Sequence, residues 1–143
     1  MALIFKNPQG VPEPAANYRH MAIIPPNKRL LILAGQIGNV QDGTLLENVE
    51  EQYDQALKNI IDIVISEGGR SEDIARISIF LVGKPDGSRI RESNNKYFPS
   101  GPPAMSWLYV AGLFRPDVKV EIEGMLAYYL SLIHISEPTR RPI

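Results

Sequence analysis

The sequence GPPAMSWLYVAGLFRPDVKVEIE, residues 101–123, carries the strongest structural signal in the chain. In its second half, VKVEIE, apolar and charged residues alternate with the period of two that is typical of a strand with one buried face. Its first half holds an apolar run, and a turn with a proline and an aspartate separates the two halves. We therefore expect two strands here, over 104–111 and over about 118–128.

Two apolar segments nearer the N-terminus predict a β-hairpin. They span 18–24 and 30–34, and the sequence PPNK between them supplies turn residues. Gly35 follows the second segment. A glycine at such a place either relieves backbone strain or lets another chain or a ligand approach closely.

Two further segments have the spacing of helices. From Asn48 to Val64, apolar residues recur every three or four positions, and a Gly-Gly pair follows soon after. Asn48 with Glu51 three residues on resembles a capping box. A second, more polar helix is expected over 88–98, before a series of prolines. Between the helices, alternation over 76–81 predicts a strand.

The predicted order β-β-α-β-α-β-β indicates a single α+β domain. Right-handed crossovers around each helix give a two-layer sandwich, with a mixed sheet and both helices on one of its faces. The opposite face would be bare, and the apolar run over 107–110 cannot be hidden on one side alone. We therefore expect the protein to form oligomers.

Composition narrows the function classes. The 143 residues include 15 Lys and Arg against 16 Asp and Glu, so there is no broad basic field for nucleic acid. The lack of cysteine excludes disulfides and thiolate chemistry, and two histidines are too few for a usual metal cluster. We expect no metal and no cofactor. Because the sequence has no evident secretory signal or membrane-spanning run, a cytoplasmic protein without a membrane partner is expected.

The last segment of the chain has a different character. LSLIHISEPTR, from Leu130 to Arg140, resembles the translation of a transposon-type sequencing adapter. On that interpretation the domain spans 1–129, and residues 130–143 are a non-native tail. The alternative is an ordinary polar C-terminal tail.

Three motifs resemble those of the RidA/YjgF family of small imine and enamine deaminases. In the family, the counterpart of 101–123 has a proline-alanine pair, an arginine, a strand, a short turn and a V-E-I-E strand. LAGQIG over 33–38 is similar to the family's S-G-Q-I/V segment, and 51–60 is similar to its E-x-Q…A-x-x-N-I helix. The resemblance covers about 18–127. It implies a chorismate-mutase-like subunit, a homotrimer around a packed barrel of sheets, and three small-molecule clefts at the subunit interfaces.

The resemblance also implies an activity and a site. In the family, the cleft hydrolyses reactive imines and enamines, typically 2-imino acids. An arginine holds the substrate carboxylate, and a glutamate positions or activates the attacking water. The glutamate corresponds to Glu121, the tyrosine at the cleft edge to Tyr18, and the glycine whose backbone approaches the substrate to Gly35. The family's asparagine corresponds to Asn94, or to Arg91 if the gap differs by a few residues.

The chain departs from the family at the arginine, which is Met105 here, and a cysteine often found two residues later is Trp107. Losing a charged hydrogen bond costs about 1.5–3 kcal/mol, which is about ten- to a hundredfold in affinity. We therefore expect weak or no activity on simple 2-imino acids, and a preference for a ligand with an apolar group at Met105. The alternative is that Arg91, Arg89 or Arg115 from a neighbouring subunit supplies the missing charge.

Three function classes follow. The first is a deaminase with a weak or altered substrate range, and the second is a non-catalytic trimer that binds a small metabolite or has a regulatory partner. The third is an RNA-cleaving activity sometimes attached to the family, which the lack of a basic stripe and of a histidine pair disfavours. Glu121 could also be a solvated strand residue, and Met105 and Trp107 could be packing residues.

Overall fold

Four strands form the main sheet in the computed structural model, which describes residues 2–128. Their order across the sheet is β3 (Arg29–Ile37), β6 (Val120–Tyr128), β4 (Ile74–Leu81) and β5 (Ala104–Tyr109). β4 and β5 run parallel, whereas the other neighbouring pairs are antiparallel, so the sheet is mixed. β5 forms one edge of this sheet.

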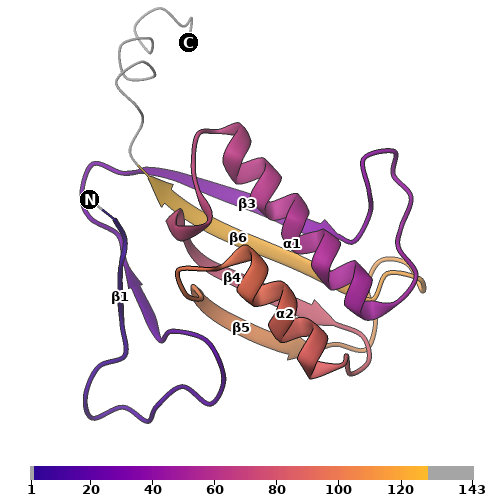
Figure 1. The fold of residues 1–143 in the computed structure, drawn as a ribbon, viewed down its shortest axis with the longest axis horizontal. Helices are drawn as coiled ribbons and strands as arrows, with labels where there is room; N and C mark the ends of the chain where they lie inside the picture. Colours follow the sequence, from indigo (N-terminus) through magenta and orange to yellow (C-terminus); the bar gives the residue numbers. More distant parts are fainter. Residues whose placement is uncertain (1, 129–143) are drawn as a thin grey trace, which may run out of the picture.

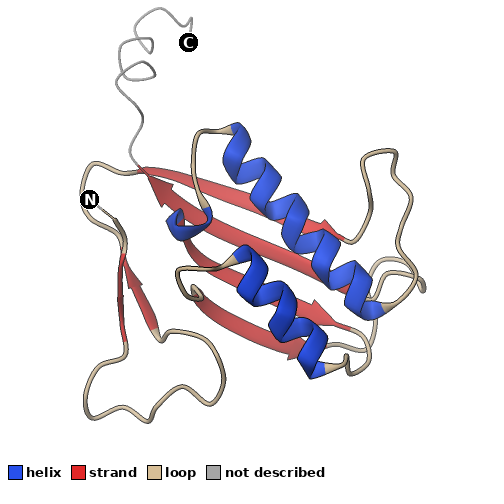
Figure 2. Cartoon of the chain, in the orientation of Figure 1, coloured by secondary structure: helices blue, strands red, loops and turns tan. Residues whose placement is uncertain are grey.

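Two helices pack on one face of the sheet (Figures 1 and 2). They are α1 (Val49–Ser66) and α2 (Gly87–Tyr97), and a 3-10 turn, η1 (Ser71–Asp73), precedes β4. Asn48 caps α1 as predicted, because its Oδ1 accepts a hydrogen bond of 2.8 Å from the Glu51 N–H. Neither described helix is long and apolar enough to cross a membrane.

Alternation along the strands builds the core. Val120 and Ile122 of β6 are fully buried under the helices, as are Ile77 and Ile79 of β4. Side chains at the intervening positions point to the other face of the sheet. That face therefore carries the β6 residue Glu121.

The helix-free face is covered at one end and open elsewhere. β1 (Ile4–Lys6) and β2 (Met21–Ile23) pair into a small antiparallel sheet. The apolar cluster of this sheet covers one end of the face. Beyond it, Leu30, Ile32 and Leu108 remain 53%, 77% and 43% exposed. This apolar surface agrees with the predicted bare face.

The predicted fold class is confirmed, while the predicted hairpin is wrong. β2 pairs with β1, and β3 pairs along its length with β6 instead. Pro25 and Pro26 lack an N–H, so they end the β2 ladder rather than continue it into a hairpin. β1 was missed because three residues give too short an alternation to detect. The proposed boundary at 129 and tail over 130–143 lie outside the described residues.

Candidate functional site

A cleft of about 670 Å³ opens between β5, α2 and the loop that precedes β2. Four of the six predicted site residues line it: Tyr18, Asn94, Met105 and Trp107. The other two, Gly35 and Glu121, are not part of its lining. One chain therefore brings three distant segments of the sequence together at the cleft. Gly35 and Glu121 lie elsewhere in the same chain.

β5 supplies the apolar wall of the cleft. Met105 and Trp107 lie beside Ile77 and Ile79 of β4, whose side chains are fully buried under the helices. The Trp107 ring packs against Tyr53 of α1, with the ring centroids 5.7 Å apart. Met105 packs against the same core. This wall offers an aromatic and a thioether surface, but no cation for an anionic group.

Tyr18 reaches the cleft because its loop is attached to the start of β5. The Arg19 N–H donates a hydrogen bond of 3.3 Å to the Pro103 carbonyl oxygen, and Arg19 forms a parallel bridge with Ala104. The Tyr18 hydroxyl oxygen accepts a hydrogen bond of 3.2 Å from the Ala15 N–H. The Tyr18 O–H can therefore still donate to a ligand.

A hydrogen bond from α1 orients Asn94 on α2. The Tyr53 hydroxyl donates to Oδ1 of Asn94 at 2.5 Å. Burial raises the pKa of Tyr53 well above its ordinary value, although the hydrogen bond to Asn94 opposes this. The phenol therefore stays protonated and keeps donating. Because Oδ1 is occupied, Asn94 offers its Nδ2 donor to the cleft that it lines.

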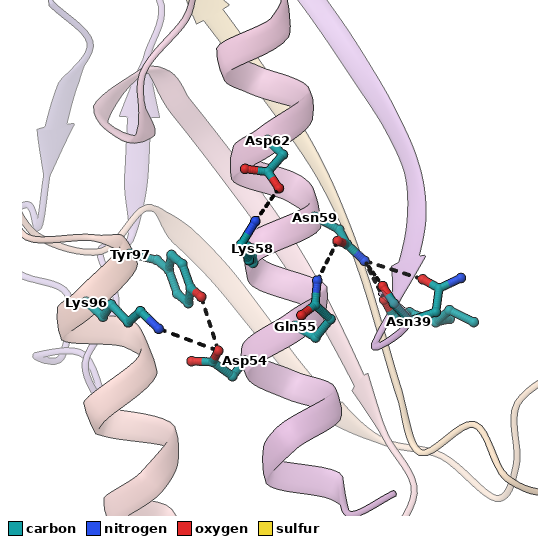
Figure 3. A network of polar contacts seen from close by, with 9 residues as sticks. Asn39, Asp54, Gln55, Lys58, Asn59, Asp62, Lys96 and Tyr97 are labelled. Carbon is teal, nitrogen blue, oxygen red and sulfur yellow. Dashed lines mark hydrogen bonds and ion pairs between the residues drawn. The ribbon is translucent and has the colours of Figure 1, made fainter. Parts of the chain in front are cut away.

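Asp54 of α1 holds α2 at further points. It accepts hydrogen bonds from Ser93 Oγ at 2.7 Å and from the Tyr97 hydroxyl at 3.1 Å, and it lies 3.7 Å from Lys96 Nζ. Figure 3 shows Tyr97 and Lys96 converging on Asp54 from α2. Burial chiefly raises the pKa of Tyr97, so its hydroxyl stays protonated at neutral pH. These contacts fix the helix that forms one side of the cleft.

The family-like residues of α1 serve the fold rather than the cleft. Gln52 is fully buried and donates to the carbonyl oxygens of Leu46 and Asp117, both at 2.9 Å. Asn59 donates to the Asn39 carbonyl oxygen at 2.9 Å, and Gln55 donates to Asn59 (Figure 3). The side-chain amides of Gln52 and Asn59 thus donate to backbone carbonyl groups in the loops around α1.

Gly35 and Glu121 meet each other on the helix-free face. A Cβ on Gly35 would lie 2.0 Å from Glu121 Oε2 and 2.7 Å from its Cγ. The side chain of Glu121 therefore lies over the Gly35 backbone, where another residue would displace it. Val120 and Ile122 point toward the helices, so alternation sends Glu121 the other way. Within one chain, the sheet separates this carboxylate from the Met105 wall.

Of the three arginines that could replace the missing charge, Arg91 lines the cleft. Arg89 lies 4.0 Å from Glu50 and faces a different cavity. Arg115 Nε lies 3.1 Å from Asp117. Arg91 and Met105 line this cleft within one chain.

Sequence reasoning missed Ile90 and Leu108 in the cleft. A signal for the first was present, because Gly87, Ile90, Arg91 and Asn94 recur at helical spacing and share one stripe of α2. For Leu108, which lies at the open edge of the sheet, the apolar run over 107–110 indicated an oligomer surface rather than a cleft. Among residues 2–128, no group of His, Cys, Asp and Glu side chains is arranged to hold a metal ion.

The fold and the cleft define a two-layer α+β domain of the RidA type, with a ligand-sized cleft at the sheet edge. The sequence model of the family described as endoribonuclease L-PSP matches residues 9–128. The chain belongs to this family, which is also known as the RidA/YjgF family.

Named relatives agree with this assignment. Reactive Intermediate Deaminase A of Arabidopsis thaliana chloroplasts is 34% identical over 96 residues, 66% of this chain and 51% of the relative, so the chain spans about half its length. The human 2-iminobutanoate/2-iminopropanoate deaminase is 30% identical over 99 residues, 68% of this chain and 72% of the relative. The solved structure of the Rid-family protein YyfB from Yersinia pestis has a TM-score of 0.78 at 23% identity. It covers 90% of this chain and 100% of its own, which supports the fold.

Proposed function

We propose that the protein is a RidA-type hydrolase that deaminates reactive imine or enamine intermediates as a homotrimer. The observation that carries this proposal is the convergence of Tyr18, Asn94, Met105 and Trp107 on one cleft in a chain of this family. Two relatives named as deaminases, one of them for 2-imino acids, support the same reaction class.

The reaction adds water to the carbon of the C=N bond. Glu121 accepts a proton from the attacking water, whose oxygen bonds to that carbon to give a tetrahedral carbinolamine. The proton then passes from Glu121 to the nitrogen. Glu121 next takes the hydroxyl proton of the carbinolamine and passes it to the nitrogen, so that the C=O bond forms, the C–N bond breaks and ammonia leaves the carbonyl product. Tyr18 donates a hydrogen bond to the substrate, and the backbone at Gly35 lies against it. Water, a carboxylate and hydrogen-bond donors suffice for these steps.

The trimer supplies what one chain lacks. Glu121 and Gly35 lie on the helix-free face, whereas the cleft opens at β5, the edge strand. A second copy that packs its helix-free face against this edge would bring its own Glu121 to the cleft. The exposed Leu30 and Ile32 on that face support such packing.

Met105 changes the substrate range. In place of a guanidinium, the cleft presents Met105 and Trp107 as an apolar wall. We propose that this wall contacts an apolar substituent of the substrate, so that simple 2-imino acids are hydrolysed weakly. The proposal includes no cofactor, no nucleic-acid or membrane partner, and a cytoplasmic location.

Decay of enzymatically generated 2-imino acids, compared between the wild type and Met105→Arg, tests this function. We expect the wild type to prefer imines with a large apolar side chain. Met105→Arg should gain about tenfold or more on 2-iminopropanoate, because β5 then offers a carboxylate a charged hydrogen bond that Met105 lacks. Met105→Leu is the matched control and should not gain. A wild type that already hydrolyses 2-iminopropanoate as well as Met105→Arg would contradict the role given to Met105.

The alternative function is a non-catalytic trimer that binds a small metabolite and has lost deaminase activity. Met105 in the family's arginine position favours it, because no strand cation remains to hold a 2-imino acid. Glu121→Gln separates the two functions. If the wild type and Glu121→Gln both leave imine decay at the uncatalysed rate while ligands still bind the cleft, the alternative holds.

A further inference from the structure

Arg91 differs from every other arginine in the described part of the chain. Its guanidinium makes no hydrogen bond or ion pair within residues 2–128. The others each have a partner, as seen for Arg19, Arg29, Arg70, Arg76, Arg89 and Arg115. An exposed guanidinium with five unused donors is able to bind a planar anion through two parallel hydrogen bonds.

Asn94 adds a second donor on the same side of α2. It follows Arg91 by three residues, so the two side chains are neighbours on the helix surface, and both line the cleft. The Tyr53 hydroxyl occupies Oδ1 of Asn94 and leaves Nδ2 as the donor. Within one chain, the cleft lining includes no aspartate or glutamate that would neutralise Arg91.

The apolar residues of the cleft lining indicate that the ligand also has an apolar group. Met105 and Trp107 form the β5 wall, and the buried Ile90 lies on α2 beside Arg91. A cleft of about 670 Å³ is larger than a three- or four-carbon acid needs. One cation with one amide suits a single negative charge better than a phosphate dianion.

We infer that Arg91 and Asn94 form a carboxylate-binding pair, and that the cleft takes small carboxylates with an aromatic or branched apolar group against Met105 and Trp107. This inference deepens the proposed function and rests on it for the reaction, but not for binding. The carboxylate is held from the helix side, which leaves the strand side for the apolar group. A small 2-imino acid could reach Arg91 but would lack the apolar contact.

Trp107 provides a readout that needs no catalysis, because it is the single tryptophan of the chain and lines the cleft. The probes are 3-phenylpropanoate and its neutral analogue 3-phenylpropanamide, titrated against the full-length protein while tryptophan fluorescence is followed. The variants are Arg91→Gln and Arg91→Lys. The matched control is Arg89→Gln, which removes an arginine two residues away that pairs with Glu50 outside the cleft.

We expect the wild type to bind the carboxylate more tightly than the amide. Arg91→Gln should weaken carboxylate binding by about ten- to a hundredfold and leave amide binding unchanged, since one charged hydrogen-bonded pair is lost. Arg91→Lys should restore part of the affinity, because it keeps the charge without the two-pronged geometry. Arg89→Gln should bind like the wild type.

Several results would overturn the inference: no binding of either probe, equal affinity for acid and amide, or equal losses in Arg91→Gln and Arg89→Gln. The proposed function fails by a different measurement. If Arg91-dependent binding is found but 2-imino-3-phenylpropanoate is not hydrolysed, the carboxylate pair stands and the reaction does not. If that imine is hydrolysed equally by wild type and Arg91→Gln, the reaction stands and the pair does not.

Discussion

At Gly35, a single hydrogen in place of a side chain determines where the Glu121 carboxylate lies. We predict that Gly35→Ala destabilises the fold by about 0.5–1.5 kcal/mol, because the new methyl group overlaps the Glu121 side chain and forces it out of its rotamer. In a Glu121→Ala background the same change should cost less than about 0.5 kcal/mol. Chemical denaturation of the four proteins measures this coupling. Gly112→Ala, whose Cβ would meet nothing within 4 Å, is the control and should be neutral in both backgrounds.

An equal cost of Gly35→Ala in both backgrounds would show that the alanine clashes with the backbone rather than with Glu121. The sequence could identify Gly35 and Glu121 separately, one as a glycine after an apolar run and the other by strand alternation. It could not show that they touch. That contact depends on β3 lying beside β6, and these strands are more than 80 residues apart in the chain.

Arg91 illustrates a different limit of sequence reasoning. The sequence left open whether Asn94 or Arg91 occupies the family's asparagine position, because a gap of a few residues decides between them. On a helix the two positions are neighbours, and both line the cleft. Both residues therefore belong to the cleft, whichever of them occupies the family's asparagine position.

Between elements, the Tyr53 hydroxyl links α1 to α2 through Asn94. We predict that Tyr53→Phe lowers the free energy of unfolding by about 1 kcal/mol near neutral pH, since a buried hydrogen bond is lost. The pKa of Tyr53 is raised on folding, so its contribution is fully present below its unfolded value of 10.0 and is lost as pH rises above it. The stability difference between wild type and Tyr53→Phe should therefore shrink between about pH 8.5 and about pH 11.

Urea titrations at both pH values measure this difference. Comparing variants is necessary because burial also raises the pKa of Tyr97 and Tyr128, so the wild type alone loses stability at alkaline pH for several reasons. Tyr97→Phe serves as the control for a half-exposed phenol on α2 and should show a smaller pH-dependent change. A stability difference that grows with pH would contradict the buried, protonated state of Tyr53.

The hairpin error also belongs to the scale of elements. PPNK supplied turn residues between two apolar runs, which is the local signature of a hairpin. The pairing is instead decided by long-range partners, because seven residues of β3 pair with β6. Helices were easier to place, since Asn48 and the apolar spacing of α1 act within one segment. The sequence therefore predicted the cleft residues through the family motifs, and not through the order of the strands in the sheet.

At the scale of the whole molecule, the open part of the helix-free face exposes apolar side chains that one chain alone does not bury. We predict that the protein is a trimer in solution, with a mass near three times the 16.0 kDa of one chain, and that Ile32→Lys makes it monomeric. Ile32 is 77% exposed at the open part of this face, and a lysine there would place a charge in the proposed interface. Sedimentation velocity measures the mass.

Ile65→Lys is the matched control, because Ile65 is also an exposed isoleucine, 59% accessible, but lies near the end of α1 on the opposite layer. It should leave the trimer intact. If Ile32→Lys abolishes imine hydrolysis together with the trimer while its own fold survives, the loss fits a cleft completed by the partner subunit's Glu121. A wild-type monomer that hydrolyses imines at full rate would contradict the shared cleft, and would require the Glu121 of the same chain to act from across the sheet.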